Sequence, residues 1–258
     1  MIDPPAPTVS WSGTPPTHCG LPALSAVGVA HAFTTRHHGS CDAVSAPAGP
    51  FGDRRWPALE ALHVESRDVQ YARQVHGDTC LDADRADAAG LVGMGDALFT
   101  RQRGRPLAIF TADCVPLILV DPEAPALGMA HAGWRGTVRG IAGRLVAALV
   151  EQAGARPERL RAAIGPSIGP CCYEVDEPVM GPLRAAFPEA WARWVHPGAP
   201  GRWSLDLWAA NADQLAAAGV PAGAIASPRL CTGCRRDLFF SYRKEGMAGR
   251  LATLAVLD

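Results

Sequence analysis

The stretch TADCVPLILV, residues 111–120, places a carboxylate and a thiol directly before a continuous apolar run. A second apolar run, PLAIF at residues 106–110, comes immediately before it. Near-continuous apolar strands are buried on both faces, so residues 111–114 are predicted to break two buried strands. A polar pair beside a buried strand must be hydrogen-bonded, ion-paired or metal-ligating, because a bare charge there is too costly. The pattern therefore predicts a functional site at the strand ends.

Two histidines elsewhere in the chain occupy similar positions. His131 ends another apolar run and opens HAGWRGT (residues 131–137), and His76 lies in QVHG (residues 74–77) after a predicted strand. We expect His76, Cys114 and His131 to converge on one metal ion. Two imidazoles and a thiolate suit zinc, and three protein ligands with an open position are typical of a catalytic zinc site. Copper also accepts these donors, so their types leave the metal open.

Charged residues near these candidate ligands have predicted roles of their own. Asp113 is expected to orient a histidine or to move protons. Arg135 directly precedes a helix that is predicted to begin near Val138 and to end before Gly154. An arginine beside a helix start suits an anion, and Arg36, at the end of a predicted strand, is a second candidate anion contact.

The eight cysteines are expected to be free, ligating or catalytic, because a cytoplasmic chain of this length seldom carries disulfides. If Cys114 is not a ligand, it is a candidate nucleophile of a Cys–His hydrolase. At least one of the adjacent cysteines Cys171 and Cys172 is expected to pack in the interior, since neighbouring cysteines rarely both bind one metal. CTGC at residues 231–234 has no second CxxC and no thioredoxin-like context, so neither a four-cysteine metal site nor a redox pair is expected.

The composition is that of an ordinary soluble globular chain, with 48% hydrophobic and 19% charged residues. The net charge of −1 and the lack of a basic block speak against a nucleic-acid partner. No apolar run approaches the roughly 18 residues that span a bilayer. The N-terminus lacks the features of a secretory signal, so a cytoplasmic location is predicted. Residues 1–23, rich in Pro, Ser, Thr and Gly, are predicted to form an irregular arm.

Three local patterns complete the prediction. Residues 82–95 are predicted to be a loop, because their glycines do not form a GxGxxG motif in a strand–turn–helix context. Residues 205–218 are predicted to be a helix with Asp206 as its N-cap. His37 and His38 are interpreted as exposed loop histidines and not as a metal site. Adjacent side chains on an extended chain point to opposite faces, so the two rings are not expected to meet at one ion.

Several motifs, in order along the chain, resemble those of the YfiH or laccase-domain family. They are QVHG (74–77), TADC (111–114), HAGWRGT (131–137), IGPSIGPCCYEV (164–175), LDLW (205–208) and FFSYRKE with GR (239–250). The resemblance implies an α+β fold of two packed mixed β-sheets with flanking helices, in a single catalytic domain over residues 24–258. It also implies metal ligation by His76, Cys114 and His131. The chain departs from the family after Arg36, because the usual pattern is Thr-Arg-x-Gly-Gly-Val-Ser and here Thr35-Arg36 is followed by His37-His38-Gly39-Ser40, which bears on substrate preference.

The resemblance also implies a function. It suggests a zinc-dependent purine nucleoside phosphorylase, acting on inosine, adenosine, guanosine and methylthioadenosine, that also deaminates adenosine. The implied site residues are Cys114, His76, His131 and Asp113 for catalysis, and Arg36, Gln74, Arg135 and Arg243 for substrate and phosphate. The alternatives are a copper-dependent polyphenol oxidase (laccase) and a cysteine or metal hydrolase that edits peptidoglycan precursors. The expected partners are small purine nucleosides and phosphate, without nucleic acid or membrane, and the chain is expected to be a monomer or small homo-oligomer.

Overall fold

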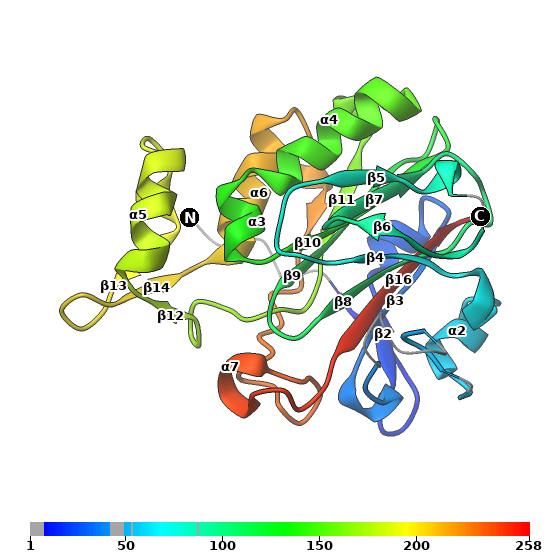
Figure 1. Cartoon of the computed structure of the whole chain (residues 1–258), viewed down its shortest axis with the longest axis horizontal. Coiled ribbons are helices and arrows are strands. Elements are labelled where there is room, and N and C mark those ends of the chain that lie inside the picture. The colour runs from blue at the N-terminus through cyan, green and yellow to red at the C-terminus, as the bar shows by residue number, and fades with distance from the viewer. Residues whose placement is uncertain (1–7, 42–48, 53, 87) are drawn as a thin grey trace.

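The two apolar runs that flank residues 112–114 are strands in different sheets. In the computed structural model, which describes residues 8–41, 49–52, 54–86 and 88–258, they are β8 (Leu107–Thr111) and β9 (Val115–Asp121). β8 belongs to a seven-stranded sheet and β9 to a six-stranded sheet (Figure 1). The polar break is therefore the corner at which the chain passes from one sheet to the other, and Asp113 turns this corner with a φ of +90°.

The seven-stranded sheet has the order β1-β2-β3-β16-β8-β4-β6. β4 pairs in parallel with β6 and β8, whereas β16 pairs antiparallel with β3 and β8, so the sheet is mixed. Its remaining strands are β1 Ser10–Ser12, β2 His18–Gly20, β3 Val29–Thr34, β4 Gln70–Arg73, β6 Gly90–Met94 and β16 Leu251–Leu257.

The six-stranded sheet has the order β15-β11-β9-β10-β7-β5, and it is mixed as well. Its remaining strands are β5 Cys80–Asp82, β7 Ala97–Thr100, β10 Ala126–Ala132, β11 Arg161–Ile164 and β15 Ile225–Ala226. A small third sheet has the order β12-β14-β13. Its strands are β12 Glu174–Val175, β13 Val195–Pro197 and β14 Trp203–Leu205.

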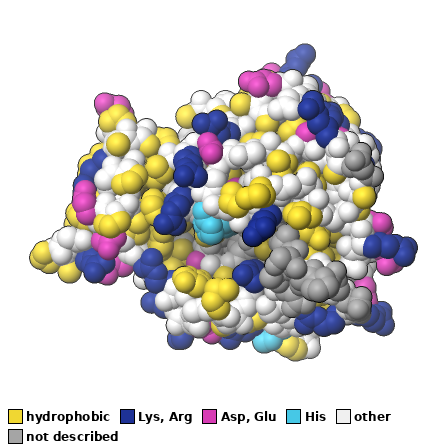
Figure 2. Space-filling view, viewed as in Figure 1, with side chains coloured by type: hydrophobic (Ala, Val, Ile, Leu, Met, Phe, Trp, Pro, Cys, Tyr) yellow, Lys and Arg dark blue, Asp and Glu magenta, His cyan; other side chains and the backbone are white. Residues whose placement is uncertain are grey.

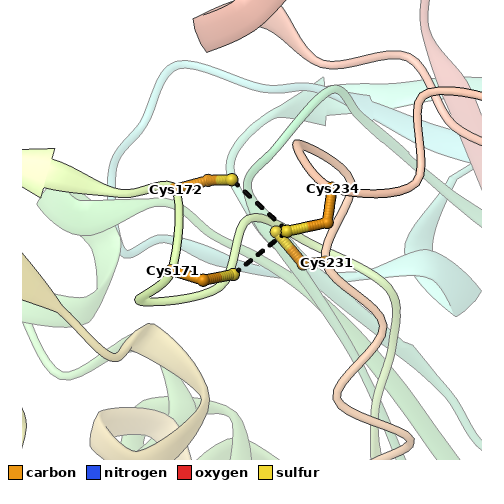
Figure 3. Close-up of side chains that lie close together, drawn as sticks. All are labelled: Cys171, Cys172, Cys231 and Cys234. Carbon is orange, nitrogen blue, oxygen red and sulfur yellow. Dashed lines mark hydrogen bonds between the residues drawn. The ribbon is translucent and has the colours of Figure 1, made fainter.

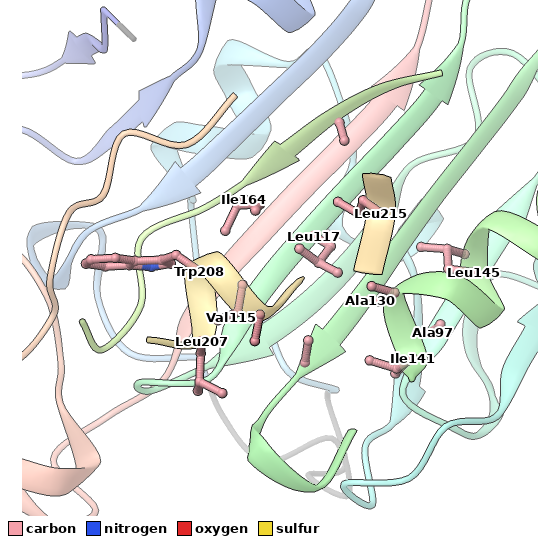
Figure 4. Close-up of a cluster of buried hydrophobic side chains, with 14 of the residues drawn as sticks. Ala97, Val115, Leu117, Ala130, Ile141, Leu145, Ile164, Leu207, Trp208 and Leu215 are labelled. Atoms are coloured by element: carbon pink, nitrogen blue, oxygen red, sulfur yellow. The ribbon is translucent and has the colours of Figure 1, made fainter. Parts of the chain in front are cut away.

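Strand β9 is apolar from Val115 to Val120 because both of its faces are buried. Leu117 packs with the helices α4 (Ile141–Ala153) and α6 (Leu207–Ala217) in one hydrophobic cluster (Figure 4). Its neighbour Ile118 belongs to a second cluster, which lies between the two large sheets. Side chains on a strand alternate between the faces of the sheet, so a central strand without polar positions needs a layer on each side.

The outer face of the seven-stranded sheet is covered by helix α2 (Pro57–Ala61). Phe110 of β8 clusters there with Trp56 and Leu59, whereas Ile109 faces the other large sheet. In Figure 1, α4 runs along the upper edge of the sheets and α2 lies at the lower right. The layers are thus helix, sheet, sheet and helix, and the predicted α+β fold of two packed mixed sheets is confirmed.

The helix predicted to begin near Val138 is two helices. α3 (Trp134–Val138) begins directly after Gly133, and α4 follows it after a break at Gly140, where the φ of +76° cannot continue a helix. Arg135 therefore lies inside the short α3 and does not precede a helix.

Two predicted helix ends are confirmed. α4 ends at Ala153 with Gly154 as its C-cap residue, and the Asp206 side chain caps the start of α6 by accepting a hydrogen bond from the Ala209 amide. The other helices are α1 Pro22–Ser25, α5 Glu177–Ala186 and α7 Tyr242–Glu245. Among the described residues, no helix combines the length and the apolar character needed to cross a membrane.

Two segments predicted to be irregular contain strands. Within residues 1–23, β1 and β2 pair antiparallel at the edge of the seven-stranded sheet, and residues 1–7 lie outside the described residues. Within residues 82–95, of which residue 87 is not described, β6 pairs with β4 at the opposite edge. Edge strands tolerate glycine and need a partner on one side only, so composition gives little sign of them. Residues 41–55, which are rich in Gly, Pro and Ala, are also predicted from the sequence to be a loop, and residues 42–48 and 53 of this stretch lie outside the described residues.

The interpretation of both loop histidines as exposed was wrong for His38. His37 is exposed, but His38 is only 7% exposed and its ring lies 4.6 Å from that of Trp56. Its Nε2 accepts a hydrogen bond of 3.2 Å from the Ala58 amide. The departure from the family pattern at residues 37–40 therefore contributes to the packing of α2.

His38 makes the stability of the fold sensitive to acid. Burial, with smaller effects from His18 and Arg54, lowers the pKa of His38 to about 4. The unfolded chain takes up this proton near pH 6.5, so the stabilisation is complete above about pH 6.5 and is lost as the pH falls towards 4. Unfolding by urea at about pH 7.5 and about pH 5 should reveal a His38 contribution of roughly 2 kcal/mol to the difference in the free energy of unfolding. His38→Gln keeps an acceptor for Ala58 and should lose less stability on acidification; equal losses in the two proteins would contradict this.

Candidate metal centre

Strand ends from both large sheets bring His76, Cys114 and His131 together, and we call this group the His–Cys–His centre. Their candidate ligand atoms all lie within 4.8 Å of one another. Cys114 directly precedes β9, and His131 lies near the end of β10, which is the antiparallel neighbour of β9. His76 comes from the turn after β4 and has a φ of +58°. The sequence analysis expected these three side chains to converge, and the structure places them side by side.

Cys114 and His131 polarise one another. Burial alone would raise the pKa of the Cys114 thiol, but His131 and His76 lower it to about 6 through their charge and hydrogen bonds. Burial would likewise lower the pKa of His131, but Cys114 and Asp96 raise it to about 9. The metal-free pair is therefore a thiolate and an imidazolium at neutral pH. The thiolate is the form of cysteine that binds metals.

Asp96 supports the His–Cys–His centre through a hydrogen bond to His131, and it was not predicted from the sequence. It is fully buried, and its Oδ1 lies 2.8 Å from His131 Nδ1. The hydrogen bonds of His131 and of the Gly77 amide outweigh the effect of burial and lower the pKa of Asp96. An ionised carboxylate can only accept, so His131 Nδ1 is the donor and its Nε2 is left for a ligand.

The same carboxylate shapes the turn that carries His76. Asp96 Oδ1 accepts from the His76 amide at 2.9 Å, and its Oδ2 accepts from the Gly77 amide at 2.7 Å and the Val75 amide at 3.1 Å. One buried side chain thus positions both histidines. The sequence did contain a signal, because Asp96 directly precedes the apolar strand β7 just as Asp113 closely precedes β9.

Asp113 contacts neighbouring loops and does not hydrogen-bond a histidine. Its Oδ1 accepts from Thr232 Oγ1 at 2.6 Å, and its Oδ2 accepts from the Arg243 amide at 2.7 Å. Its backbone carbonyl accepts from the Ile168 amide at 2.9 Å. The place expected for a histidine-orienting carboxylate is occupied by Asp96. A role for Asp113 in proton movement stays a prediction.

A cleft of about 820 Å³ opens over the His–Cys–His centre. This volume is within the usual range of small-molecule sites. Figure 2 shows a histidine in a hollow of this face, with basic side chains around it. The basic residues that line the cleft are Arg73, Arg135, Arg243 and Arg250. Among the described lining residues the one carboxylate is Asp113, so the cleft suits an anionic ligand.

Two of the predicted substrate contacts, Arg135 and Arg243, line this cleft. The Arg135 guanidinium stacks on Trp134 at 4.4 Å from the ring centre, and no acid among the described residues forms an ion pair with it. Arg243 stacks on Tyr173 at 4.9 Å and donates to the Glu174 carbonyl. An alternative interpretation of the sequence, in which Arg135 only pairs with a surface acid, therefore finds no support in the described part of the chain.

The other two predicted contacts have partners in the fold. Gln74 lines the cleft, but its amide pairs with the backbone of Phe110 through bonds of 2.7 and 2.8 Å. Arg36 forms an ion pair of 2.8 Å with Glu245 and stacks on Phe240. Arg36 is not among the described residues that line the cleft. Contacts of Gln74 and Arg36 with a substrate stay predictions.

The fold and the site define an α+β protein with two packed mixed sheets and a candidate metal centre in a basic cleft. The family described as multi-copper polyphenol oxidoreductase laccase matches residues 53–258. The chain belongs to this family, which is the YfiH or laccase-domain family of the sequence analysis.

The relatives extend the match over nearly the whole chain. Purine nucleoside phosphorylase YlmD of Geobacillus stearothermophilus is 37% identical, over 90% of this chain and 91% of that protein. Adenosine deaminase RL5, from an unknown prokaryotic organism, is 39% identical over 83% of this chain and 84% of that protein. The crystal structure of YlmD from Geobacillus stearothermophilus superimposes with a TM-score of 0.85 at 33% identity, covering 97% of this chain and 100% of that one.

Proposed function

We propose that this protein is a zinc-dependent purine nucleoside phosphorylase that also deaminates adenosine, with inosine, adenosine, guanosine and methylthioadenosine as substrates. The observation that carries the proposal is the His–Cys–His centre at the base of a small-molecule cleft lined by arginines. The names of the relatives support it, since one is a purine nucleoside phosphorylase and another an adenosine deaminase.

The donor set fits a zinc ion. His76 and His131 offer ring nitrogens, Cys114 offers a thiolate, and Asp96 fixes the orientation of His131. When bound, the metal would supply Lewis acidity towards an oxygen of phosphate or water. Copper accepts the same donors, so metal analysis of protein purified without added metal decides between the two.

The residues that line the cleft supply phosphate binding and proton movement. In phosphorolysis a phosphate oxygen forms a bond to the ribose C1′ while the bond from C1′ to the purine breaks. Arg135 and Arg243 bind the phosphate anion and hold it beside the centre. In deamination water adds to the purine C6 and ammonia leaves. We assign proton movement in both reactions to Asp113, which adjoins Cys114 in the cleft wall.

Product analysis tests the proposal directly. Inosine with phosphate is expected to yield hypoxanthine and ribose 1-phosphate, and inosine without phosphate is expected to yield neither. Adenosine without phosphate is expected to yield inosine and ammonia. Protein stripped of metal by a chelator serves as the control. A metal-loaded protein that converts neither nucleoside would show that the proposal is wrong.

Arg135 should separate the two reactions. Arg135→Met keeps an aliphatic side chain on Trp134 but removes the charge-assisted hydrogen bonds to phosphate, each worth about 1.5–3 kcal/mol. The KM for phosphate is expected to rise about 10- to 100-fold, while adenosine deamination, which uses no phosphate, stays within about twofold. Arg184→Met, at a half-buried arginine of α5 that stacks on Trp191 and is not among the residues described as lining the cleft, is the matched control. Equal losses in both reactions would contradict a phosphate contact.

Polyphenol oxidation is the second candidate, because the description of the family names it. Multicopper catalysis uses several copper ions, whereas the His–Cys–His centre offers ligands for one. The other group of metal-ligating side chains among the described residues consists of four thiols without histidine. Oxygen uptake with a phenol by copper-loaded protein tests this candidate.

Release of an amino acid from a muropeptide precursor tests the third candidate, a peptidoglycan-editing hydrolase.

A further inference from the structure

Four cysteines from two distant segments form a second cluster outside the cleft. Cys171 and Cys172 lie on one loop, Cys231 and Cys234 on another, and their sulfur atoms all lie within 4.8 Å of one another (Figure 3). Cys234 Sγ is 3.4 Å from Cys171 Sγ and 3.5 Å from Cys172 Sγ. No four-cysteine site was predicted from the sequence, because the sequence contains no second CxxC. The fold supplies the missing pair from adjacent cysteines.

A tight turn allows the adjacent cysteines to point the same way. The amides of Cys172 and Tyr173 both donate to the Gly169 carbonyl, at 2.9 and 3.0 Å. On an extended chain, neighbouring side chains would point to opposite faces. On this turn the thiols of Cys171 and Cys172 both face the second loop (Figure 3).

Backbone hydrogen bonds hold the two loops in register. Ser167 and Cys231 form a parallel bridge, in which the Ser167 amide donates to Leu230 and the Thr232 amide donates to Ser167. The Gly169 amide donates to Cys231 Sγ at 3.2 Å. An amide that donates to sulfur favours the thiolate, which is the form that binds metal.

The surroundings of the cluster also suit a charged metal–thiolate group. A Cβ at Gly233 would lie 2.8 Å from Cys172 Cβ and 3.0 Å from its Sγ, so glycine is required for the loops to close. Lys244 Cε lies 3.6 Å from the position of this Cβ, so the lysine side chain packs beside the second loop. Cys171 and Cys234 are exposed, which gives an ion a path from solvent.

We propose that Cys171, Cys172, Cys231 and Cys234 bind one zinc ion in a closed, structural site. Four cysteine ligands in a tetrahedron are a structural zinc pattern. With zinc–sulfur bonds of about 2.3 Å, a tetrahedron places its sulfur atoms about 3.8 Å apart. The observed separations of 3.4 and 3.5 Å, within a cluster no wider than 4.8 Å, need only small shifts to reach this geometry.

The site would hold together two loops, one of which lines the cleft and the other of which leads to its wall. The first loop contributes Ile168 and Tyr173 to the cleft lining, and the second leads to Arg243. Asp113 receives hydrogen bonds from both sides, through the Ile168 amide and through Thr232. The proposal does not depend on the reaction proposed above, because the ion takes no part in it.

Metal analysis of the whole chain separates this site from the His–Cys–His centre. Cys114→Ala removes the thiolate of that centre and leaves the four-cysteine cluster intact. Purified anaerobically with a thiol reductant, it is expected to hold about one zinc per chain by mass spectrometry, and Cys114→Ala/Cys234→Ser about none. Cys80→Ser, at a half-buried thiol outside both groups, is the control and should match the wild type.

Cobalt gives a readout that does not need the double variant to fold. Cys114→Ala reconstituted with Co²⁺ is expected to show strong thiolate-to-cobalt charge-transfer absorption, and its thermal midpoint should rise on metal binding. Iron instead of zinc would overturn the assignment of the metal. The site itself would be disproved by folded Cys114→Ala that binds neither ion, or by a disulfide among these four cysteines in freshly isolated protein.

Discussion

Cys114→Ala is expected to abolish phosphorolysis and deamination together, lowering kcat/KM for inosine and adenosine by more than about 100-fold. The change removes one of three ligands, and it also removes the negative charge that stabilises the His131 imidazolium. Zinc content should fall from about two ions per chain to about one if the four-cysteine site is also filled. The measurements are zinc per chain and steady-state rates, with Cys80→Ser as the control.

Cys114→Ala and metal-free wild type together distinguish a role of Cys114 as a metal ligand from a role as a nucleophile. If Cys114 is a ligand, activity and the metal of the His–Cys–His centre are lost together. If its thiolate were instead the nucleophile of a hydrolase, wild-type protein would keep its activity after metal removal. Turnover of inosine by Cys114→Ala, or by metal-free wild type, would rule out the metal-dependent scheme.

Asp96→Asn is expected to weaken both the metal centre and the fold. The buried carboxylate accepts from three backbone amides as well as from His131, and an asparagine amide must direct its NH2 group towards some of these donors. Metal affinity should fall about 10- to 100-fold, as when other residues behind a ligating histidine are replaced. The loss of a buried, fully bonded carboxylate should lower the free energy of unfolding by roughly 3 kcal/mol.

Asp121→Asn provides a matched control for this change. Asp121 is also fully buried and accepts from backbone amides and from Arg159, but it lies at the far end of β9 from Cys114. It should lose stability without losing metal affinity. The measurements are zinc competition against a coloured chelator and urea unfolding. If both variants kept the wild-type affinity, Asp96 would not be a positioning residue for the centre.

The core strands and the members of the His–Cys–His centre could be predicted from the sequence. A strand buried on both faces is apolar except near its ends, so β8, β9 and β10 can be recognised from their apolar runs. Functional side chains at the ends of such strands are conspicuous for the same reason. Cys114, His131 and His76 were found in this way, and the family motifs indicated the same three residues.

Edge strands and buried loops could not be predicted in this way. β6 is rich in glycine and β1 lies in a segment full of turn residues, so local composition argued for loops. Their hydrogen bonds to β4 and β2 come from pairing, which composition does not encode. His38 was misread for a related reason, since its burial depends on Trp56 packing over it.

The sequence by itself determined where the buried strands lie, which side chains stand at their ends, and the family to which the chain belongs. Only the tertiary structure decided that Asp96 holds both histidines, that Arg36 pairs with Glu245, and that four cysteines meet. Burial leaves a local pattern in the sequence, because each buried position of a strand favours an apolar residue at that position. The meeting of distant side chains depends on strand register and loop closure, which no short segment contains.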